Sequence, residues 1–333
     1  MTPLHRRGFL SAGIALALRN AKLDEAVALI EKATASGEVR AAALHVQQGR
    51  SILARGFGQA RGPEEVFLLA SISKPMTAAG VMILVERRRL SLEDPVRRHL
   101  PEFAGGDRDL VILRHLLTHT SGLPDMLPEN LALRKRFAPL SEFVARACRT
   151  PLLFKPGAQV RYQSMGILLA AEIAQRVAGM PFREFLRKEL FSPLRMRRTS
   201  LGLGGRRISD TALCQVPDEP WGWNSPYWRD LGAPWGGVHG TAGDVARFLR
   251  YFARPTGRVL RPATVQSMVR KQTPGSKEAY GLGWRVTLGG FGRACSERTY
   301  GHSGSTGTMC WMDPVRDLSF VLLTTRPLAE SAP

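Results

Sequence analysis

Hydrophobic and polar residues alternate near both ends of the chain, whereas apolar residues recur at helical spacing in between. Residues 41–47 and 51–57 lie on either side of the polar Gln48-Gly49-Arg50, which predicts a β-hairpin. Because strand patterns flank a helical middle, we predict an α+β fold, with an antiparallel sheet, flanking helices and an inserted, mostly helical domain. The later strand patterns fall at residues 283–288, 299–303, 308–312 and 318–325.

The middle of the chain carries most of the helical patterns. Residues 76–85 are apolar or small on nearly every side, which predicts a buried helix. Residues 217–235 are rich in proline, glycine and tryptophan and predict a loop. Periodic apolar positions predict further helices at residues 23–33, 112–118, 164–178 and 245–252.

The length of 333 residues fits two domains or one large composite unit. We expect residues 20–72 and 235–333 to form the sheet domain and residues 73–234 to form the helical domain of one such unit. Hydrophobic residues make up 44% and charged residues 23%, values typical of a soluble globular protein. No apolar run reaches the roughly 20 residues that span a bilayer, so a multi-span membrane protein is excluded.

A net charge of +19 often indicates a nucleic-acid binder, but the distribution of the basic residues does not support that interpretation here. Arginines supply 39 of the 47 basic residues and are spread from end to end, without a module that combines aromatic and basic residues. We therefore expect no nucleic-acid partner; a small-molecule or peptide substrate is implied instead by the motifs described below. The four cysteines lack paired C-x-x-C spacing, so a thiolate zinc site is not expected.

The N-terminal residues resemble a short twin-arginine export signal. Arg6-Arg7 precedes an apolar stretch to Leu18 that includes the small-residue site Ala15-Leu16-Ala17. Residues 1–19 thus predict a periplasmic or secreted protein, with an ordinary terminus and a cytoplasmic location as the alternative. After export, Cys295 and Cys310 are the favoured disulfide pair, although free buried thiols are equally compatible with the sequence.

The sharpest chemical motif is Ser71-Ile72-Ser73-Lys74, directly before the buried helix. A serine three residues before a lysine places both side chains on one helical face. A serine hydroxyl is a weak nucleophile until a base removes its proton, and burial of a lysine lowers its pKa so that it can be this base. The alternative interpretation of Ser71 is a helix N-cap.

Further motifs in order resemble the serine β-lactamase and penicillin-binding-protein superfamily. The resemblance is to its class C branch, which includes family VIII-type esterases and D-amino-acid peptidases, and it covers roughly residues 40 to 325. It implies a β-lactamase/transpeptidase-like fold, an acyl-enzyme mechanism and no cofactor or metal. The motifs are SISK at 71–74, LRHLLTHTSGLP at 113–124, FKPG at 154–157, RYQS at 161–164, FSPL at 191–194, GG at 236–237, TAGD at 241–244 and GHSG at 301–304.

This resemblance assigns roles to individual residues. It implies that Ser71 is the acylated nucleophile, assisted by Lys74 and Tyr162, and it leaves open which of the two removes the Ser71 proton. The backbone amides of Ser71 and Ser305 would form the oxyanion hole. The residues expected to bind substrate are Ser164, His302, Ser303 and Gly304.

Two departures from the family pattern affect the expected substrate. Ser164 stands where many members have Asn, and His302 stands where β-lactamases have Lys. Because histidine is mostly neutral at pH 7, it does not grip a carboxylate as an ammonium does. We expect esters or amides as substrates with weak β-lactamase activity, and an inactive cell-wall sensor is the alternative. His115 and His119 lack an evident third ligand, so they predict helix packing and not a metal site.

Overall fold

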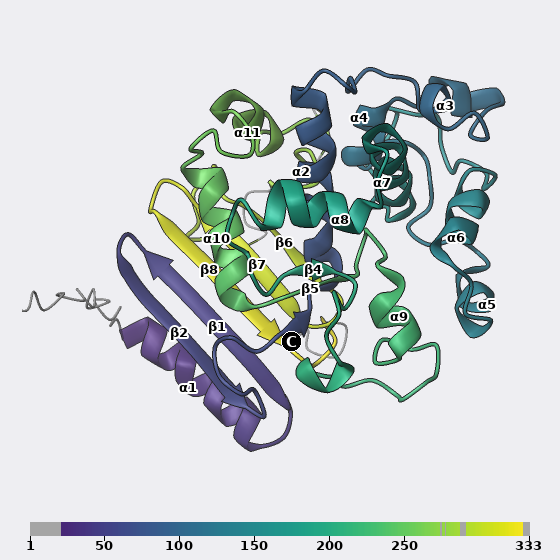
Figure 1. Ribbon diagram of the computed structural model, residues 1–333. Coiled ribbons are helices and arrows are strands. Elements are labelled where there is room, and N and C mark those ends of the chain that lie inside the picture. Colours follow the sequence, from purple (N-terminus) through teal and green to yellow (C-terminus); the bar gives the residue numbers. More distant parts are fainter. Residues whose placement is uncertain (1–20, 274, 277, 287–290, 329–333) are drawn as a thin grey trace, which may run out of the picture.

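The strands predicted near the two chain ends form one antiparallel sheet (Figure 1). The structure is a computed structural model that describes residues 21–273, 275–276, 278–286 and 291–328. The N-terminal hairpin pairs with the last strand, so that Val46 lies opposite both Leu53 and Phe320. The α+β architecture is therefore confirmed. The strands, in sheet order, are β2 (Ser51–Gly58), β1 (Ala41–Gln48), β8 (Leu318–Thr324), β7 (Thr308–Asp313) and β6 (Tyr300–Gly304).

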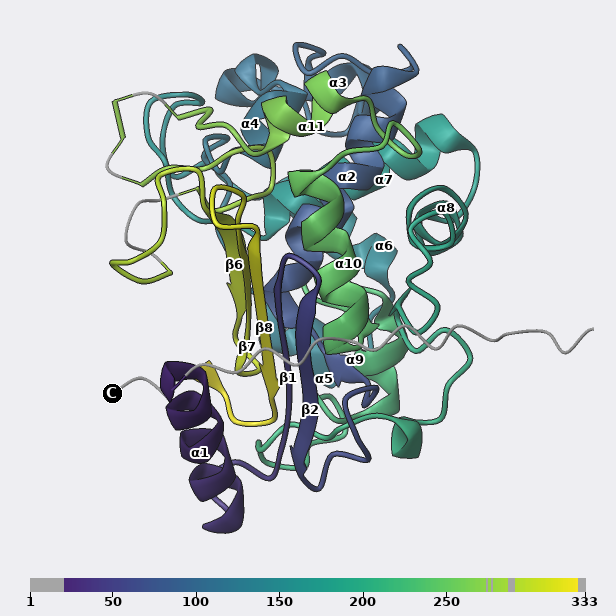
Figure 2. The same cartoon turned by 90° about the vertical axis from the view of Figure 1, so that its left-hand side faces the viewer.

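Helices cover both faces of this sheet (Figure 2). Helix α1 (Ala21–Ala35) packs Leu23, Val27 and Ile30 against an apolar cluster on β1, β2 and β8. Helix α10 (Ala242–Ala253) lies against the opposite face, where it contacts β1, β7 and β8. The alternation of the strands explains this arrangement, because successive side chains point to opposite faces.

Two long helices form the centre of the helical region: α2 (Ser73–Glu86) and α7 (Met165–Ala178). Helix α2 is buried almost throughout, as its uniformly apolar sequence predicts, and α7 ends at Gly179 in a left-handed conformation. The shorter helices are α3 (Val96–His99), α4 (Leu113–Leu117), α5 (Asn130–Lys135), α6 (Leu140–Ala147), α8 (Phe182–Leu186), α9 (Pro226–Leu231) and α11 (Pro262–Met268). Single turns of 3₁₀ or π type cover Ala70–Ile72, Gly106–Leu110, Arg187–Phe191 and Ile208–Asp210.

A small second sheet crosses the predicted boundary between the two domains. It joins β3 (Phe67–Leu68), β5 (Val238–Gly240) and β4 (Ser200–Leu201), although β4 comes from within the predicted helical domain. Strands of two or three residues are too short to show the period-two pattern that predicts a strand.

Two further predictions need correction. Residues 217–235 are not only a loop, because they contain α9, which begins at the cap Ser225 and ends at the left-handed Gly232. In the predicted strand at 283–288, Arg285 forms isolated bridges with Tyr280 and Gly301, and no strand is present over the described residues 283–286. Residues 287–288 lie outside the described residues.

Other sequence-based expectations have simpler outcomes. The predicted export signal lies outside the described residues. Cys295 and Cys310 are free thiols, and the Cys295 thiol donates to the Phe291 carbonyl.

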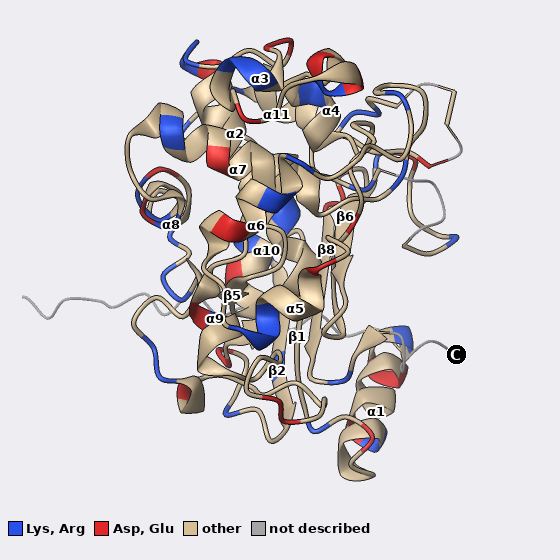
Figure 3. Cartoon of the chain, turned by 90° about the vertical axis from the view of Figure 1, so that its right-hand side faces the viewer, with Lys and Arg blue, Asp and Glu red and all other residues tan. Residues whose placement is uncertain are grey.

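Among the described helices, none combines the length and the apolar character that crossing a bilayer requires. Basic and acidic segments are interspersed over the face in Figure 3, and many arginines pair with carboxylates, for example Arg176 with Glu102 and Glu172.

Candidate active site

Ser71 lies in a strained turn that leads into α2. The 3₁₀ turn Ala70–Ile72 precedes the helix, and Ile72 rather than Ser71 is its N-cap residue, so the N-cap interpretation of Ser71 is wrong. Ala70 has a φ of 47°, a left-handed conformation that costs a residue with a side chain about 1–3 kcal/mol. The surrounding contacts hold this strained backbone, which leaves the Ser71 side chain partly exposed.

Lys74 is completely buried directly below Ser71. Its Nζ contacts Ser71 Oγ at 3.0 Å and donates to the Trp235 carbonyl at 3.0 Å. Burial lowers the pKa of Lys74 to about 7, against an opposing effect of the Asp125 carboxylate. At neutral pH a large fraction of the amine is therefore uncharged, and its lone pair can accept the Ser71 proton.

Tyr162 completes the group of three that the sequence predicted. Its ring centroid lies 4.7 Å from Lys74 Nζ. Burial raises the pKa of the phenol above its usual range, and hydrogen bonding with the Ser71 hydroxyl opposes this shift. The phenol therefore stays protonated at neutral pH, so it can donate a proton, whereas Lys74 is the group able to accept one.

The turn after β6 and the first residue of β7 are hydrogen-bonded to the backbone that precedes Ser71. Thr306 Oγ1 donates to the Leu68 carbonyl at 2.8 Å, and Thr308 Oγ1 donates to the Leu69 carbonyl at 2.9 Å. Neither the Ser71 amide nor the Ser305 amide donates a hydrogen bond to another described residue. The oxyanion hole formed by these two amides therefore stays a prediction, and the two threonines are positioning residues that the motifs did not reveal.

Three of the four residues expected to bind substrate are buried by the protein itself. Ser164 is 1% exposed and donates to Asp125 Oδ1 at 2.6 Å. A Cβ added to Gly304 would lie 2.5 Å from the Leu69 carbonyl oxygen. The space beside this glycine is therefore filled by the protein's own backbone and not by substrate. His302 is 4% exposed, which leaves the partly exposed Ser303 as the residue best placed to meet a substrate.

The His302 ring is uncharged, as its replacement of Lys predicted. Burial, with the nearby Lys74 charge, lowers its pKa to about 3. Its Nδ1 lies 2.7 Å from the Ser303 carbonyl oxygen, which fixes a proton on Nδ1. The ring centroid is 6.1 Å from that of Tyr162.

Sequence reasoning missed two charged residues around this centre. Asp125 follows the motif at 113–124 and holds Ser164, and its charge raises the pKa of Tyr162 and Tyr280. Arg285 pairs its backbone with Gly301, and its charge opposes the rise that burial causes in the pKa of both tyrosines. A charged residue next to a recognised motif is the signal that could have found Asp125, whereas Arg285 depends on the tertiary fold.

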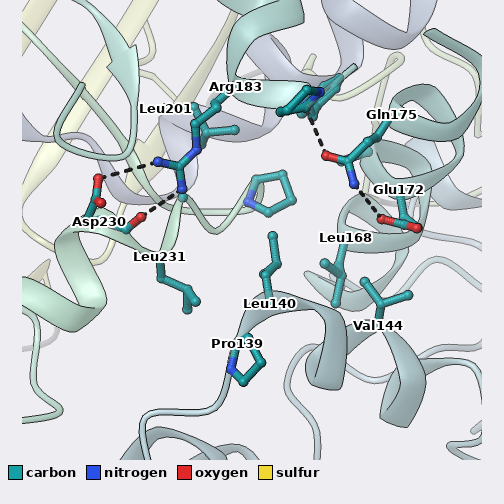
Figure 4. A pocket seen from close by; sticks show the side chains of 15 residues that line it. Pro139, Leu140, Val144, Leu168, Glu172, Gln175, Arg183, Leu201, Asp230 and Leu231 are labelled. Carbon is teal, nitrogen blue, oxygen red and sulfur yellow. Dashed lines mark hydrogen bonds and ion pairs between the residues drawn. The ribbon is translucent and has the colours of Figure 1, made fainter. Parts of the chain in front are cut away.

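A separate cavity of about 380 Å³ lies among α6, α7, α8 and α9 (Figure 4). Its floor is largely apolar, and its polar rim is paired internally, Arg183 with Asp230 and Gln175 with Glu172. None of the three reactive residues lines it. The arrangement of chemical groups, and not this cavity, therefore identifies the candidate active site.

Comparison with known proteins places this geometry in context. The family model described as Beta-lactamase matches residues 26–332. Esterase EstB of Burkholderia gladioli is 33% identical over 196 residues, which cover 54% of this chain and 48% of EstB. The D-alanyl-D-alanine-carboxypeptidase/endopeptidase AmpH of Escherichia coli (strain K12) is 26% identical over 313 residues, 86% of this chain and 80% of AmpH. The match thus spans about half of EstB and most of AmpH.

Solved structures share the fold at low sequence identity. EstCE1, described as a hydrolase with promiscuous acyltransferase activity, superposes with a TM-score of 0.77 at 22% identity, over 92% of this chain and 94% of EstCE1. A penicillin-binding protein homolog from Caulobacter crescentus gives a TM-score of 0.76 at 22% identity, over 93% of each chain. These likenesses confirm the predicted fold.

Proposed function

Because the chain belongs to the beta-lactamase family, we propose that it is a serine hydrolase that cleaves esters or amides through an acyl-enzyme on Ser71. The observation that carries this proposal is the 3.0 Å contact between Ser71 Oγ and the fully buried Lys74 Nζ. The relatives named esterase and carboxypeptidase support the same reaction class.

In the acylation step, Lys74 Nζ accepts the Ser71 proton while Oγ attacks the substrate carbonyl carbon. The amides of Ser71 and Ser305 bind the developing oxyanion. When the tetrahedral intermediate collapses, the bond to the leaving group breaks, and the leaving group takes a proton from the Tyr162 phenol. The Lys74 ammonium then returns its proton to Tyr162, whose ring centroid lies 4.7 Å from Nζ.

Deacylation uses Lys74 as the base again. Lys74 accepts a proton from water, and the resulting nucleophile attacks the ester carbonyl of the acylated Ser71. Collapse of the second intermediate releases the carboxylic acid, and Ser71 Oγ regains its proton from Lys74. The step therefore restores every group to its starting protonation state.

The neutral His302 ring is an argument for a preference for uncharged substrates. An ammonium at this position would grip the carboxylate of a β-lactam, whereas a neutral imidazole provides no such charge. We therefore propose that esters or amides are preferred and that β-lactams are turned over weakly.

Export to the periplasm is a further proposal, supported by the Arg6-Arg7 motif and its apolar continuation.

A small substrate panel tests this function. Hydrolysis of a short p-nitrophenyl ester should show a higher kcat/KM than hydrolysis of a chromogenic cephalosporin, because the ester needs no carboxylate partner. Faster turnover of the cephalosporin would contradict the proposed preference. An inactive binding protein would bind both compounds without turnover, so steady-state release of p-nitrophenol that Ser71→Ala abolishes separates the two functions.

A further inference from the structure

His119 holds both residues that flank Tyr162. It follows α4, and its carbonyl accepts a hydrogen bond from the Arg161 amide at 2.9 Å. Its ring Nδ1 accepts a second hydrogen bond from the Gln163 amide at 3.2 Å. One residue thus fixes the backbone immediately before and immediately after the phenol.

The His119 ring also packs against two tyrosine rings. Its centroid lies 4.9 Å from that of Tyr162 with an interplanar angle of 40°, and 4.5 Å from that of Tyr280 in an edge-on contact. The backbone of His119 has a φ of 61°, which residues with side chains rarely adopt. A strained backbone beside a reactive centre indicates that the conformation serves the site.

We propose that His119 is a positioning residue, which keeps the Tyr162 phenol within proton-transfer reach of Ser71 by clamping residues 161 and 163 and by packing against the phenol ring. The inference rests on the proposed function, since it concerns the group that delivers the proton in acylation.

The clamp requires an uncharged imidazole. Because Nδ1 accepts from the Gln163 amide, the proton of the neutral ring is on Nε2. Protonation of Nδ1 would place two donors face to face and break this hydrogen bond. Complete burial, together with positive charge on the neighbouring Lys74, holds the pKa of His119 well below its usual value and keeps the ring neutral.

Two substitutions separate the two parts of this role. His119→Phe keeps a ring against Tyr162 but removes the acceptor for the Gln163 amide. His119→Asn keeps a short acceptor and tolerates a positive φ, but it removes the ring.

A displacement of about 1 Å at a reacting group can cost ~100-fold in rate. We expect kcat for a p-nitrophenyl ester to fall ~100-fold in His119→Phe and ~10-fold in His119→Asn, with KM changed less than about threefold.

His115→Asn is the matched control. The His115 ring Nδ1 also accepts a backbone amide, that of Ile112 at 3.3 Å, one helical turn earlier. This variant should keep kcat within about twofold of the original protein, because the His115 ring holds the Ile112 amide. The His115 carbonyl, which accepts from the Gln163 side chain at 3.1 Å, is still present in His115→Asn. Melting temperatures show that each variant is folded, and His119→Asn alone carries the test if His119→Phe does not fold.

A double-mutant cycle with Tyr162→Phe is the decisive experiment. If His119 acts through the phenol, His119→Asn should cost no further activity once Tyr162→Phe is present. Multiplicative losses in the double variant, or an unchanged kcat in folded His119→Asn, would overturn the proposal. Either result leaves the proposed function standing, because that function is tested separately, by ester hydrolysis in the original protein and its loss in Ser71→Ala.

Discussion

Replacing Lys74 by Ala should lower kcat/KM for a p-nitrophenyl ester about 10,000-fold, the upper range for loss of a general base. Lys74 Nζ is within 3.0 Å of the Ser71 hydroxyl that must lose its proton. The raised pKa of Tyr162 keeps the phenol protonated, so it does not replace the missing amine. Steady-state kinetics on folded Lys74→Ala measures this loss.

Lys74→Arg tests whether Lys74 acts as a base or only as a charge. A guanidinium can still donate to the Trp235 carbonyl, but it does not lose its proton in the physiological range. We expect Lys74→Arg to be about as inactive as Lys74→Ala. Substantial activity in Lys74→Arg would show that the positive charge, and not the free amine, assists Ser71.

The pH dependence of the original protein provides the same information without substitution. Only the deprotonated amine accepts a proton, and burial lowers the pKa of Lys74 to about 7. The kcat/KM value should therefore rise with pH through about 7 and level off above it. A profile that is flat between pH 5 and pH 9 would contradict the role of Lys74 as the base.

Gly304→Ala should lower kcat by about 1,000-fold, which is comparable to the loss of one oxyanion donor. The added Cβ would lie 2.3 Å from Thr308 Oγ1 and 2.5 Å from the Leu69 carbonyl oxygen, both closer than atoms approach in proteins. Strand β6 must therefore move away from the turn that holds Ser71, which separates the two amides of the oxyanion hole. Kinetics with the p-nitrophenyl ester and a melting curve measure the effect.

Gly236→Ala is the control for this substitution. Gly236 also faces the Ala70 backbone, but a Cβ added there would have its nearest neighbours at 3.9 Å, an ordinary contact distance. Gly236→Ala should therefore keep nearly full activity. Equal activity of the two glycine variants would show that the close packing of β6 does not set the oxyanion geometry.

The sequence predicted those parts of the fold that leave a long periodic pattern. The hairpin at 41–57 and the helices α2 and α7 each extend over several repeats of their period, so the pattern exceeds chance. The two-residue strands β3 and β4 leave no period. Helix α9 was missed although its cap Ser225 and its terminal Gly232 were visible, because the tryptophans and prolines around it resemble a loop.

The candidate site, like the fold, could be predicted only in part from the sequence. Ser71, Lys74 and Tyr162 belong to contiguous motifs, and the fold brings them together as predicted. The partners that position them were not predictable, because each contact joins distant segments, such as Thr308 with Leu69. Sequence spacing contains no information about such contacts until the sheet and the helices are assembled.

Covalent trapping of Ser71 tests the central claim most directly. A p-nitrophenyl phosphonate should form one stable adduct, and mass spectrometry of the digested protein should place it on the Ser71 side chain. Ser71→Ala should form no adduct and should release no p-nitrophenol above background. An adduct on a different residue, or ester hydrolysis by Ser71→Ala at the original rate, would contradict the acyl-enzyme mechanism.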